Sequence, residues 1–230
     1  MPQTPAAGHA LVTGASSGIG LAIAERLLAD GWQVTGLARR AAPIMHRQFC
    51  MRRSDLADPI ARQSGLADLT GLTALVHAAG VMRSGPLGEL DVEAGAEMWR
   101  LNVDAAAFLA DRLTPQLPDG GRIVLIGSRL SAGFPRRSQY AASKAALVGL
   151  ARSWAVELVG RGITVNVVAP GATDTPMLRD SRRGAEPPRV PPIGRVVQPE
   201  EVAATVAFLL SSAAATITGQ QIVMCGGASL

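Results

Sequence analysis

The sequence predicts an α/β protein, built on one doubly wound parallel sheet of about seven strands with helices on both faces. Short apolar segments alternate with longer segments whose apolar residues recur at helical spacing, and this alternation is typical of a parallel sheet. The length of 230 residues fits one α/β domain. A hydrophobic content of 48% is enough for a sizeable core, and 25 glycines suit a fold with many loops.

Seven strands are expected, each a short run rich in apolar residues. They cover residues 10–13, 32–38, 48–52, 72–77, 122–127, 163–168 and 220–224. The helices expected between and after them cover 21–28, 58–69, 90–113, 138–159 and 199–210. Gly31 is a natural stop for the first helix, and Pro199 followed by Glu200 and Glu201 suits the start of the last. Residues 179–195 are rich in arginine and proline and are expected to form a loop.

Several small or polar residues fall where the expected strands end. They are Thr13, Ala38, Gly80, Ser128 and the Pro170-Gly171 pair. Ligands of an open parallel sheet bind beyond the carboxyl ends of its strands. The sequence therefore predicts that these residues converge on a ligand site at one edge of the sheet.

Composition argues against several other classes of protein. No apolar run reaches the roughly 18 residues of a membrane helix, and the first residues do not form a signal peptide. Two cysteines are too few for a disulfide framework, so a cytoplasmic location is expected. The net charge is +4, but aromatic residues make up only 3%, so neither a nucleic-acid nor a membrane partner is expected. His9, His46 and His77 show no metal-ligand spacing, and no metal is expected.

The most informative residues are Tyr140 and Lys144, because the chain has one tyrosine and one lysine. They lie four residues apart on an expected helix, which places both side chains on one face. A neighbouring cation favours the ionised form of a phenol. The pair is therefore predicted to transfer a proton to or from a substrate.

Glycines 14, 18 and 20 lie between the first expected strand and its helix. This arrangement lets the backbone turn tightly and approach a pyrophosphate at the helix N-terminus. After the second strand, Ala38 stands where an acidic residue would bind a ribose hydroxyl, and Arg39 and Arg40 follow. Arginine suits a phosphate, so NADP(H) is predicted in preference to NAD(H). The alternative is two exposed arginines in an ordinary loop.

These motifs, in this order, resemble the short-chain dehydrogenase/reductase family. The resemblance runs from Leu11 to Gly227. It implies a single Rossmann-like domain over residues 1–230, with a short substrate lid at 178–195. It also implies an oxidoreductase that transfers hydride between NADP(H) and a small carbonyl compound or secondary alcohol, assembled as a homotetramer or homodimer.

The resemblance also implies roles for individual residues. Asn102, Ser128, Tyr140 and Lys144 match the catalytic residues of the family. Ser128 would bind the substrate oxygen, Lys144 the nicotinamide ribose, and Asn102 would kink its helix and order a water next to Lys144. The implied cofactor-binding residues are Gly14, Ser16, Ser17, Gly18, Ile19, Gly20, Arg39, Arg40, Asp55, Leu56, Ala78, Ala79, Gly80, Tyr140, Lys144, Pro170, Gly171, Thr173 and Thr175.

The substrate is left open. Segments 81–85 and 171–175 look like the branch of the family that oxidises cyclic dihydrodiols, yet similar segments occur in ordinary ketoreductases. Five arginines could offer a cation to a substrate carboxylate, although surface charge is the simpler interpretation: Arg83, Arg136, Arg137, Arg179 and Arg182. His77 departs from the asparagine usual in the family and is expected to be an interior residue. A non-catalytic NADP(H)-binding redox sensor is the alternative from another class, but such a protein would be free to lose Tyr140 or Lys144.

Overall fold

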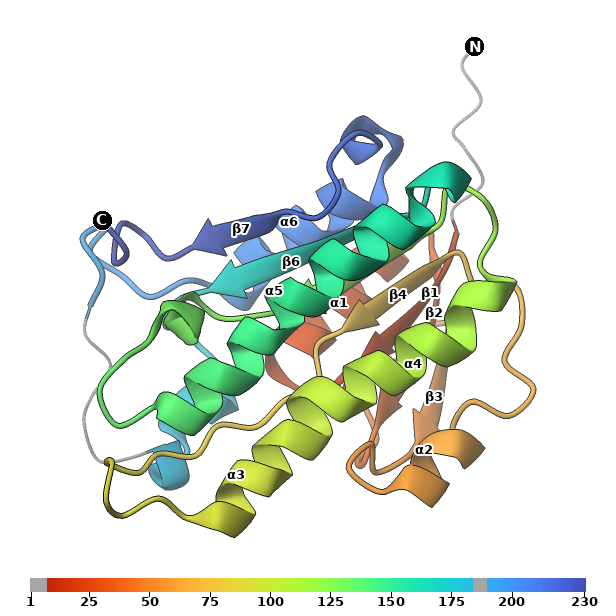
Figure 1. The fold of residues 1–230 in the computed structure, drawn as a ribbon. Helices are drawn as coiled ribbons and strands as arrows, with labels where there is room; N and C mark the ends of the chain where they lie inside the picture. Colours follow the sequence, from red (N-terminus) through yellow and green to blue (C-terminus); the bar gives the residue numbers. More distant parts are fainter. Residues whose placement is uncertain (1–7, 184–189) are drawn as a thin grey trace.

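The computed structural model describes residues 8–183 and 190–230, which form a seven-stranded parallel sheet between two layers of helices (Figure 1). The strand order is β3-β2-β1-β4-β5-β6-β7. The strands are β1 His9–Thr13, β2 Gln33–Ala38, β3 Phe49–Arg53, β4 Ala74–His77, β5 Arg122–Ile126, β6 Thr164–Pro170 and β7 Gln221–Met224. The predicted fold class and number of strands are confirmed.

The helices divide between the two faces of the sheet. On one face, α1 (Gly18–Ala29) packs beside α6 (Pro199–Leu210), and on the other lie α4 (Ala105–Leu113) and α5 (Ser138–Leu158) (Figure 1). Alternate residues of a strand point to opposite faces. Accordingly Val12 packs into the core under α1 and α6, and Leu11 into the core under α4 and α5. Both faces of the sheet are buried under helices, and this explains why the strands are almost continuously apolar.

One predicted helix, at 58–69, is wrong in length. Helix α2 spans only Pro59–Ser64. Its start is well defined, because the carboxylate of Asp58 accepts hydrogen bonds from the backbone N–H groups of Ile60 (2.8 Å) and Ala61 (3.0 Å). Gly65 follows the helix, and Asp68 then adopts a left-handed φ of 57°, which a continuing helix does not allow.

The predicted long helix at 90–113 is interrupted. It begins as α3 (Val92–Trp99), passes through a π-helical turn, η1 (Arg100–Asp104), and continues as α4. A π-turn adds a residue to a helical turn and is often found at functional sites. Asn102, the residue expected to kink this helix, lies in that turn.

Two further expectations need correction at the carboxyl edge. Strand β6 does not end before Pro170 but includes it as its last residue, paired with Met224 of β7. The segment expected to be a loop at 179–195 begins at the last residue of one 3-10 turn, η5 (Pro176–Arg179), and contains a second, η6 (Ser181–Arg183). Residues 184–189 of the expected lid lie outside the described residues.

Two general features bear on function. Within residues 8–183 and 190–230, no helix combines the length and the hydrophobicity that a membrane crossing requires. The same residues contain no group of three or more His, Cys, Asp and Glu side chains placed to hold a metal ion.

Candidate active site

Two adjoining pockets occupy the carboxyl edge of the sheet. The larger one, called the cleft below, has a volume of about 570 Å³ and lies beyond the ends of β5 and β6. The smaller one, called the small pocket, has a volume of about 190 Å³ and lies over the loop that follows β1. The two share the lining residues Ile19, Ala78, Gly80, Thr175 and Met177, so they form one continuous site.

The loop after β1 has the backbone that a bound pyrophosphate needs. Gly14 and Gly18 adopt left-handed φ values of 69° and 57°, which side chains other than glycine rarely adopt. A Cβ on Gly20 would lie 2.4 Å from the carbonyl oxygen of Gly14, so only glycine lets α1 start this close to the strand. Ser17, the N-cap residue of α1, makes no side-chain capping bond, and all four residues line the small pocket. The positive end of the α1 dipole is thus available to an anion.

The rest of the small pocket is lined by residues that follow β2 and β3. Ala38 ends β2 without an acidic side chain, and Arg39 and Arg40 follow it into the pocket lining. Both arginines are exposed, and neither forms an ion pair within the described residues. Asp55 and Leu56 line the same pocket. The chemistry of this lining fits the predicted NADP(H).

Tyr140 and Lys144 project from α5 into the cleft. Both are nearly buried, with 7% and 5% of their surfaces exposed. The ammonium of Lys144 donates a hydrogen bond of 2.8 Å to the carbonyl oxygen of Ile126, the last residue of β5. Burial lowers the pKa of Lys144 to about 8. The predicted pair therefore shares one cleft and is anchored to the edge of the sheet.

Ser128 enters the same cleft from the loop after β5. Its Oγ accepts a hydrogen bond of 3.1 Å from the backbone N–H of Leu130. A hydroxyl has one hydrogen and two lone pairs, so this bond leaves the hydrogen of Ser128 for another acceptor. A substrate carbonyl or alkoxide oxygen in the cleft is such an acceptor.

Asn102, the fourth predicted catalytic residue, lies behind the cleft and lines neither pocket. It is fully buried. Its Oδ1 accepts from Val81 N (3.0 Å), and its Nδ2 donates to Val81 O (3.2 Å) and to Ser143 Oγ (3.0 Å). A Cβ on Gly80 would lie 2.9 Å from Asn102 Oδ1 and 3.3 Å from Lys144 Nζ. The amide of Asn102 thus holds the loop after β4 against α5.

His77 connects the glycine loop to the π-turn, a role that its sequence position did not reveal. The Oγ1 of Thr13 accepts hydrogen bonds from the N–H groups of Ala78 (3.0 Å) and Ala79 (2.9 Å). Both lone pairs of that hydroxyl are then used, so its hydrogen must point to His77 Nδ1, 3.1 Å away. Nδ1 is therefore the unprotonated nitrogen, and Nε2–H donates to the carbonyl oxygen of Leu101 (3.2 Å).

Replacing His77 by leucine is expected to reduce the free energy of unfolding by about 2–4 kcal/mol at neutral pH, because a buried donor and a buried acceptor lose their partners. Burial, and then the charge of Lys144, lower the pKa of His77 to about 3. The unfolded chain therefore binds more protons between about pH 6.5 and pH 3, and wild-type stability falls as the pH falls through that window. Urea unfolding measures both effects.

The same substitution should remove part of this acid sensitivity. Between about pH 7 and pH 5, the wild type should lose about 2 kcal/mol more than His77→Leu. His77→Asn, which restores an amide donor and acceptor, should recover part of the neutral-pH stability without restoring the acid sensitivity. An identical pH dependence in wild type and His77→Leu would contradict the buried neutral imidazole.

The structure brings all the predicted cofactor residues into the lining of the two adjoining pockets. Gly14, Ser16, Ser17, Gly18, Ile19, Gly20, Arg39, Arg40, Asp55, Leu56, Ala78, Ala79, Gly80 and Thr175 line the small pocket, and Tyr140, Lys144, Pro170, Gly171 and Thr173 line the cleft. Sequence reasoning missed the roles of Thr13 and Ser143 as hydrogen-bonding partners, and it missed Arg129 in the cleft. Only Arg129 carried a usable signal, since it directly follows Ser128.

The known proteins that this chain resembles are named dehydrogenases and reductases. A family model described as "Enoyl-(Acyl carrier protein) reductase" matches residues 14–229. The chain is 38% identical to the 2,3-dihydro-2,3-dihydroxybenzoate dehydrogenase of Escherichia coli (strain K12), over 95% of this chain and 96% of that protein. It is 36% identical to the 3-oxoacyl-(acyl-carrier-protein) reductase FabG of Salmonella typhimurium, over the same shares.

Among solved structures, a short chain dehydrogenase from Burkholderia cenocepacia J2315 in complex with NADP superposes with a TM-score of 0.86 and 34% identity. The alignment covers 97% of this chain and 98% of that one. The similarity therefore extends over nearly the whole fold.

Proposed function

This chain belongs to the short-chain dehydrogenase/reductase family, and from that premise we propose that it reduces a small carbonyl compound with NADPH, or oxidises the matching secondary alcohol. Membership of the family makes it an oxidoreductase acting on CH–OH groups. The proposal goes further, to the cofactor and to Tyr140 as the general acid/base.

The observation that carries the proposal is the meeting of Tyr140, Lys144 and Ser128 in a cleft that continues into the glycine-loop pocket. In the direction of reduction, Ser128 donates its free hydrogen to the substrate oxygen, and Tyr140 donates the proton that this oxygen needs. The cation of Lys144 stabilises the negative charge left on the Tyr140 oxygen. Nicotinamide, when bound, supplies or accepts the hydride.

Asn102 acts here through other residues, as a positioning residue. Its amide fixes Val81 and Ser143, and so holds Gly80 and Lys144 in their places. Asn102 lies in the π-turn, and its buried amide bonds to both Val81, in the loop after β4, and Ser143 of α5. The backbone carbonyl of Ile126 holds Lys144 from the other side.

For the cofactor, we propose NADP(H), on the strength of Arg39 and Arg40 in the small pocket. Replacing Arg39 by alanine is expected to weaken NADPH binding about tenfold and to leave NADH binding nearly unchanged. The variant loses a charge-assisted hydrogen bond to the phosphate. Because the Arg39 side chain is exposed to solvent, the loss of NADPH affinity is limited. The quenching or enhancement of reduced-nicotinamide fluorescence measures both dissociation constants.

Arg47→Ala is the matched control, because Arg47 is also exposed, lies near in sequence and lines neither pocket. This variant should bind both cofactors as the wild type does. Equal weakening of NADPH and NADH by Arg39→Ala would refute the assignment of Arg39 to the 2′-phosphate.

The reaction itself is tested by following reduced-nicotinamide absorbance with a panel of ketones, β-ketoesters and diols. Turnover of at least one member with NADPH or NADP⁺ is expected. Tight NADPH binding without turnover of any member would instead favour the redox sensor.

The second candidate reaction is the oxidation of a cyclic dihydrodiol, favoured by the 38% identity to a dihydrodiol dehydrogenase. The diols in the panel decide between the two.

We also propose a homodimer or homotetramer, formed through the outer surfaces of α4 and α5. Val156 of α5 and Val159, the residue directly after that helix, are 77% and 60% exposed. Ala105, Ala106 and Leu147 of these two helices are buried against the sheet and cannot contribute to such a contact. The contact would therefore depend on half-buried side chains such as Leu150 and Trp154.

A further inference from the structure

We infer that Arg83 and Glu97 form a positioning pair that fixes Met82 as an apolar wall of the cleft, and that this wall makes the cleft select substrates with a bulky apolar body. The inference rests on the proposed function and adds specificity-determining residues to the same site. Met82 lines the cleft, whereas Arg83 and Glu97 line neither pocket. The pair therefore acts on the substrate through Met82.

Met82 needs such support because packing alone leaves it adaptable. Its side chain is 7% exposed and belongs to a small core whose other buried members are Met98 and Tyr140. A methionine side chain is unbranched and rotates about several bonds, so it adapts its shape to its neighbours. The loop that carries Met82, residues 78–91 between β4 and α3, forms neither helix nor strand. A wall in a fixed place therefore requires contacts that hold the backbone of this loop.

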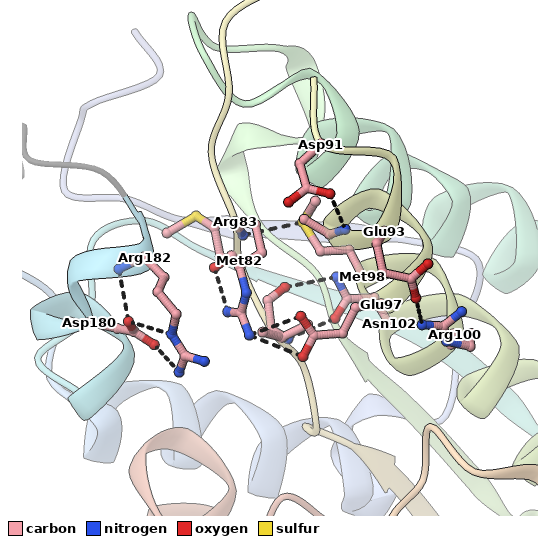
Figure 2. A network of polar contacts seen from close by, with 12 residues as sticks. Met82, Arg83, Asp91, Glu93, Glu97, Met98, Arg100, Asn102, Asp180 and Arg182 are labelled. Atoms are coloured by element: carbon pink, nitrogen blue, oxygen red, sulfur yellow. Dashed lines mark hydrogen bonds and ion pairs between the residues drawn. The ribbon is translucent and has the colours of Figure 1, made fainter. Parts of the chain in front are cut away.

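Arg83 supplies three such contacts (Figure 2). Its backbone N–H donates to Met98 Sδ over 3.3 Å, and its Nη1 donates to the carbonyl oxygen of Met82 over 3.0 Å. Its Nη2 lies 3.0 Å and 2.9 Å from the two carboxylate oxygens of Glu97. Glu97 and Met98 both belong to α3. The guanidinium thus ties the backbone of Met82 to a helix.

The pair lies where such contacts are strong. Only 13% of the Arg83 side chain is exposed, against 35% of the Glu97 side chain. Hydrogen bonds between ionised groups are stronger than neutral ones, and salt screens a partly buried pair much less than an exposed one. The fork of a guanidinium can also bond a carbonyl and a carboxylate at once, through separate nitrogens. Arg83 is therefore a tie within the protein and not a cation offered to a substrate carboxylate.

Neighbouring charges do not replace this pairing. Asp180, on the segment after β6, pairs instead with Arg182 over 2.8 Å, as Figure 2 shows. Hydrogen bonds from Arg182 lower the pKa of Asp180 to about 2, and the charge of Arg83 adds a smaller lowering. Arg179 pairs with Asp174. Each of these arginines thus has an acidic partner of its own.

The test compares cyclohexanone with acetone, two neutral ketones that differ in the size of the apolar body. Binding to the protein loaded with NADP⁺ is measured by saturation-transfer NMR titration, which does not depend on turnover. The wild type should bind cyclohexanone about tenfold or more tightly than acetone, because the ring buries additional carbon atoms. Arg83→Leu and Glu97→Gln should each reduce that preference about fivefold. Equal binding of the two ketones to the wild type, or no binding of either, overturns the inference.

Met82→Ala shows whether the pair acts through Met82. This substitution should reduce the preference at least as much as Arg83→Leu does. The variant with both substitutions should have the same preference as Met82→Ala alone, because both changes remove one wall. Additive losses would overturn the assignment, since Arg83 would then act independently of Met82.

Arg100→Leu is the matched control. Arg100 pairs with Glu93 of the same helix, but this pair is exposed and Arg100 lines neither pocket. The control should keep the wild-type preference, and an equal fall there would overturn the inference by showing a general effect of charge near α3. Arg83→Lys keeps the charge but not the fork, so it should lose part of the preference, and it replaces Arg83→Leu if that variant does not fold.

The proposed function is tested separately from this inference. Oxidation of NADPH by either ketone, followed by absorbance, requires hydride transfer. The binding preference requires none, so it can be measured whether or not the wild type turns the ketones over.

Discussion

Replacing Tyr140 by phenylalanine is expected to lower kcat by about 10²–10⁴, the contribution usual for a positioned general acid or base. The substitution removes only the hydroxyl, and the ring still fills its place near Met82 and Met98 in the small core beside the cleft. The dissociation constant for NADPH should change less than threefold, because the glycine loop and Arg39 are untouched. Steady-state measurement of reduced-nicotinamide absorbance gives kcat, and fluorescence titration gives the dissociation constant.

Ser128→Ala is the matched variant for this experiment. It removes the hydrogen offered to the substrate oxygen and keeps the general acid, so its kcat should fall by less than that of Tyr140→Phe. The backbone N–H of Leu130 loses an acceptor, but this group is only partly buried. If Tyr140→Phe reduced ketones at the wild-type rate, the proton would have to come from another donor, and the proposed roles of Tyr140 and Lys144 would both be wrong.

The sequence predicted the fold well because its strands are buried on both faces. Leu11 and Val12 face opposite cores, so the whole strand must be apolar, and such runs are easy to recognise. Element ends were predicted less well. Capping by Asp58 is readable from the sequence, but the end of α2 depends on Gly65 and on the left-handed backbone of Asp68, which tertiary packing decides.

The site residues could be predicted where a motif fixes the backbone, as at Gly14 and Gly18. The residues that hold the site in place through hydrogen bonds could not be predicted. Ser143 holds Asn102, and Thr13 holds the loop after β4, through contacts between segments 41 and 64–66 residues apart in the chain. No local pattern reports such contacts. The π-turn was foreseen only as a kink at Asn102, since the extra residue in its turn has no signal in composition or spacing.

Lys144→Met is expected to abolish most activity and at the same time to make the protein more stable at neutral pH. Burial lowers the pKa of Lys144 from 10.5 to about 8, which corresponds to about 3 kcal/mol of destabilisation below pH 8. Methionine has a similar length and no charge, so it removes that cost. In the variant, however, the carbonyl oxygen of Ile126 loses its hydrogen-bond donor, which lowers the free energy of unfolding by about 1–3 kcal/mol. A net gain of about 1 kcal/mol is expected, measured by urea unfolding at about pH 7.

The pH dependence separates this explanation from a general packing effect. Because the pKa of Lys144 is lower in the folded protein than in the unfolded chain, the unfolded chain holds the extra proton between about pH 8 and pH 10.5. Wild-type stability therefore gains a contribution as the pH rises through that window, and the variant gains none. By about pH 10 the wild type should be the more stable of the two.

Arg152→Met, which removes an exposed cation from the same helix, should leave both the stability and its pH dependence as they are in the wild type. A Lys144→Met variant that is less stable than the wild type at neutral pH, with an unchanged slope between about pH 8 and pH 10, would show that the ammonium is well solvated in the folded chain. In that case the cleft would be wetter than its lining indicates, and the cation could not act strongly on the Tyr140 oxygen, because water would screen it. The stability measurement therefore tests the catalytic role of Lys144 without any substrate.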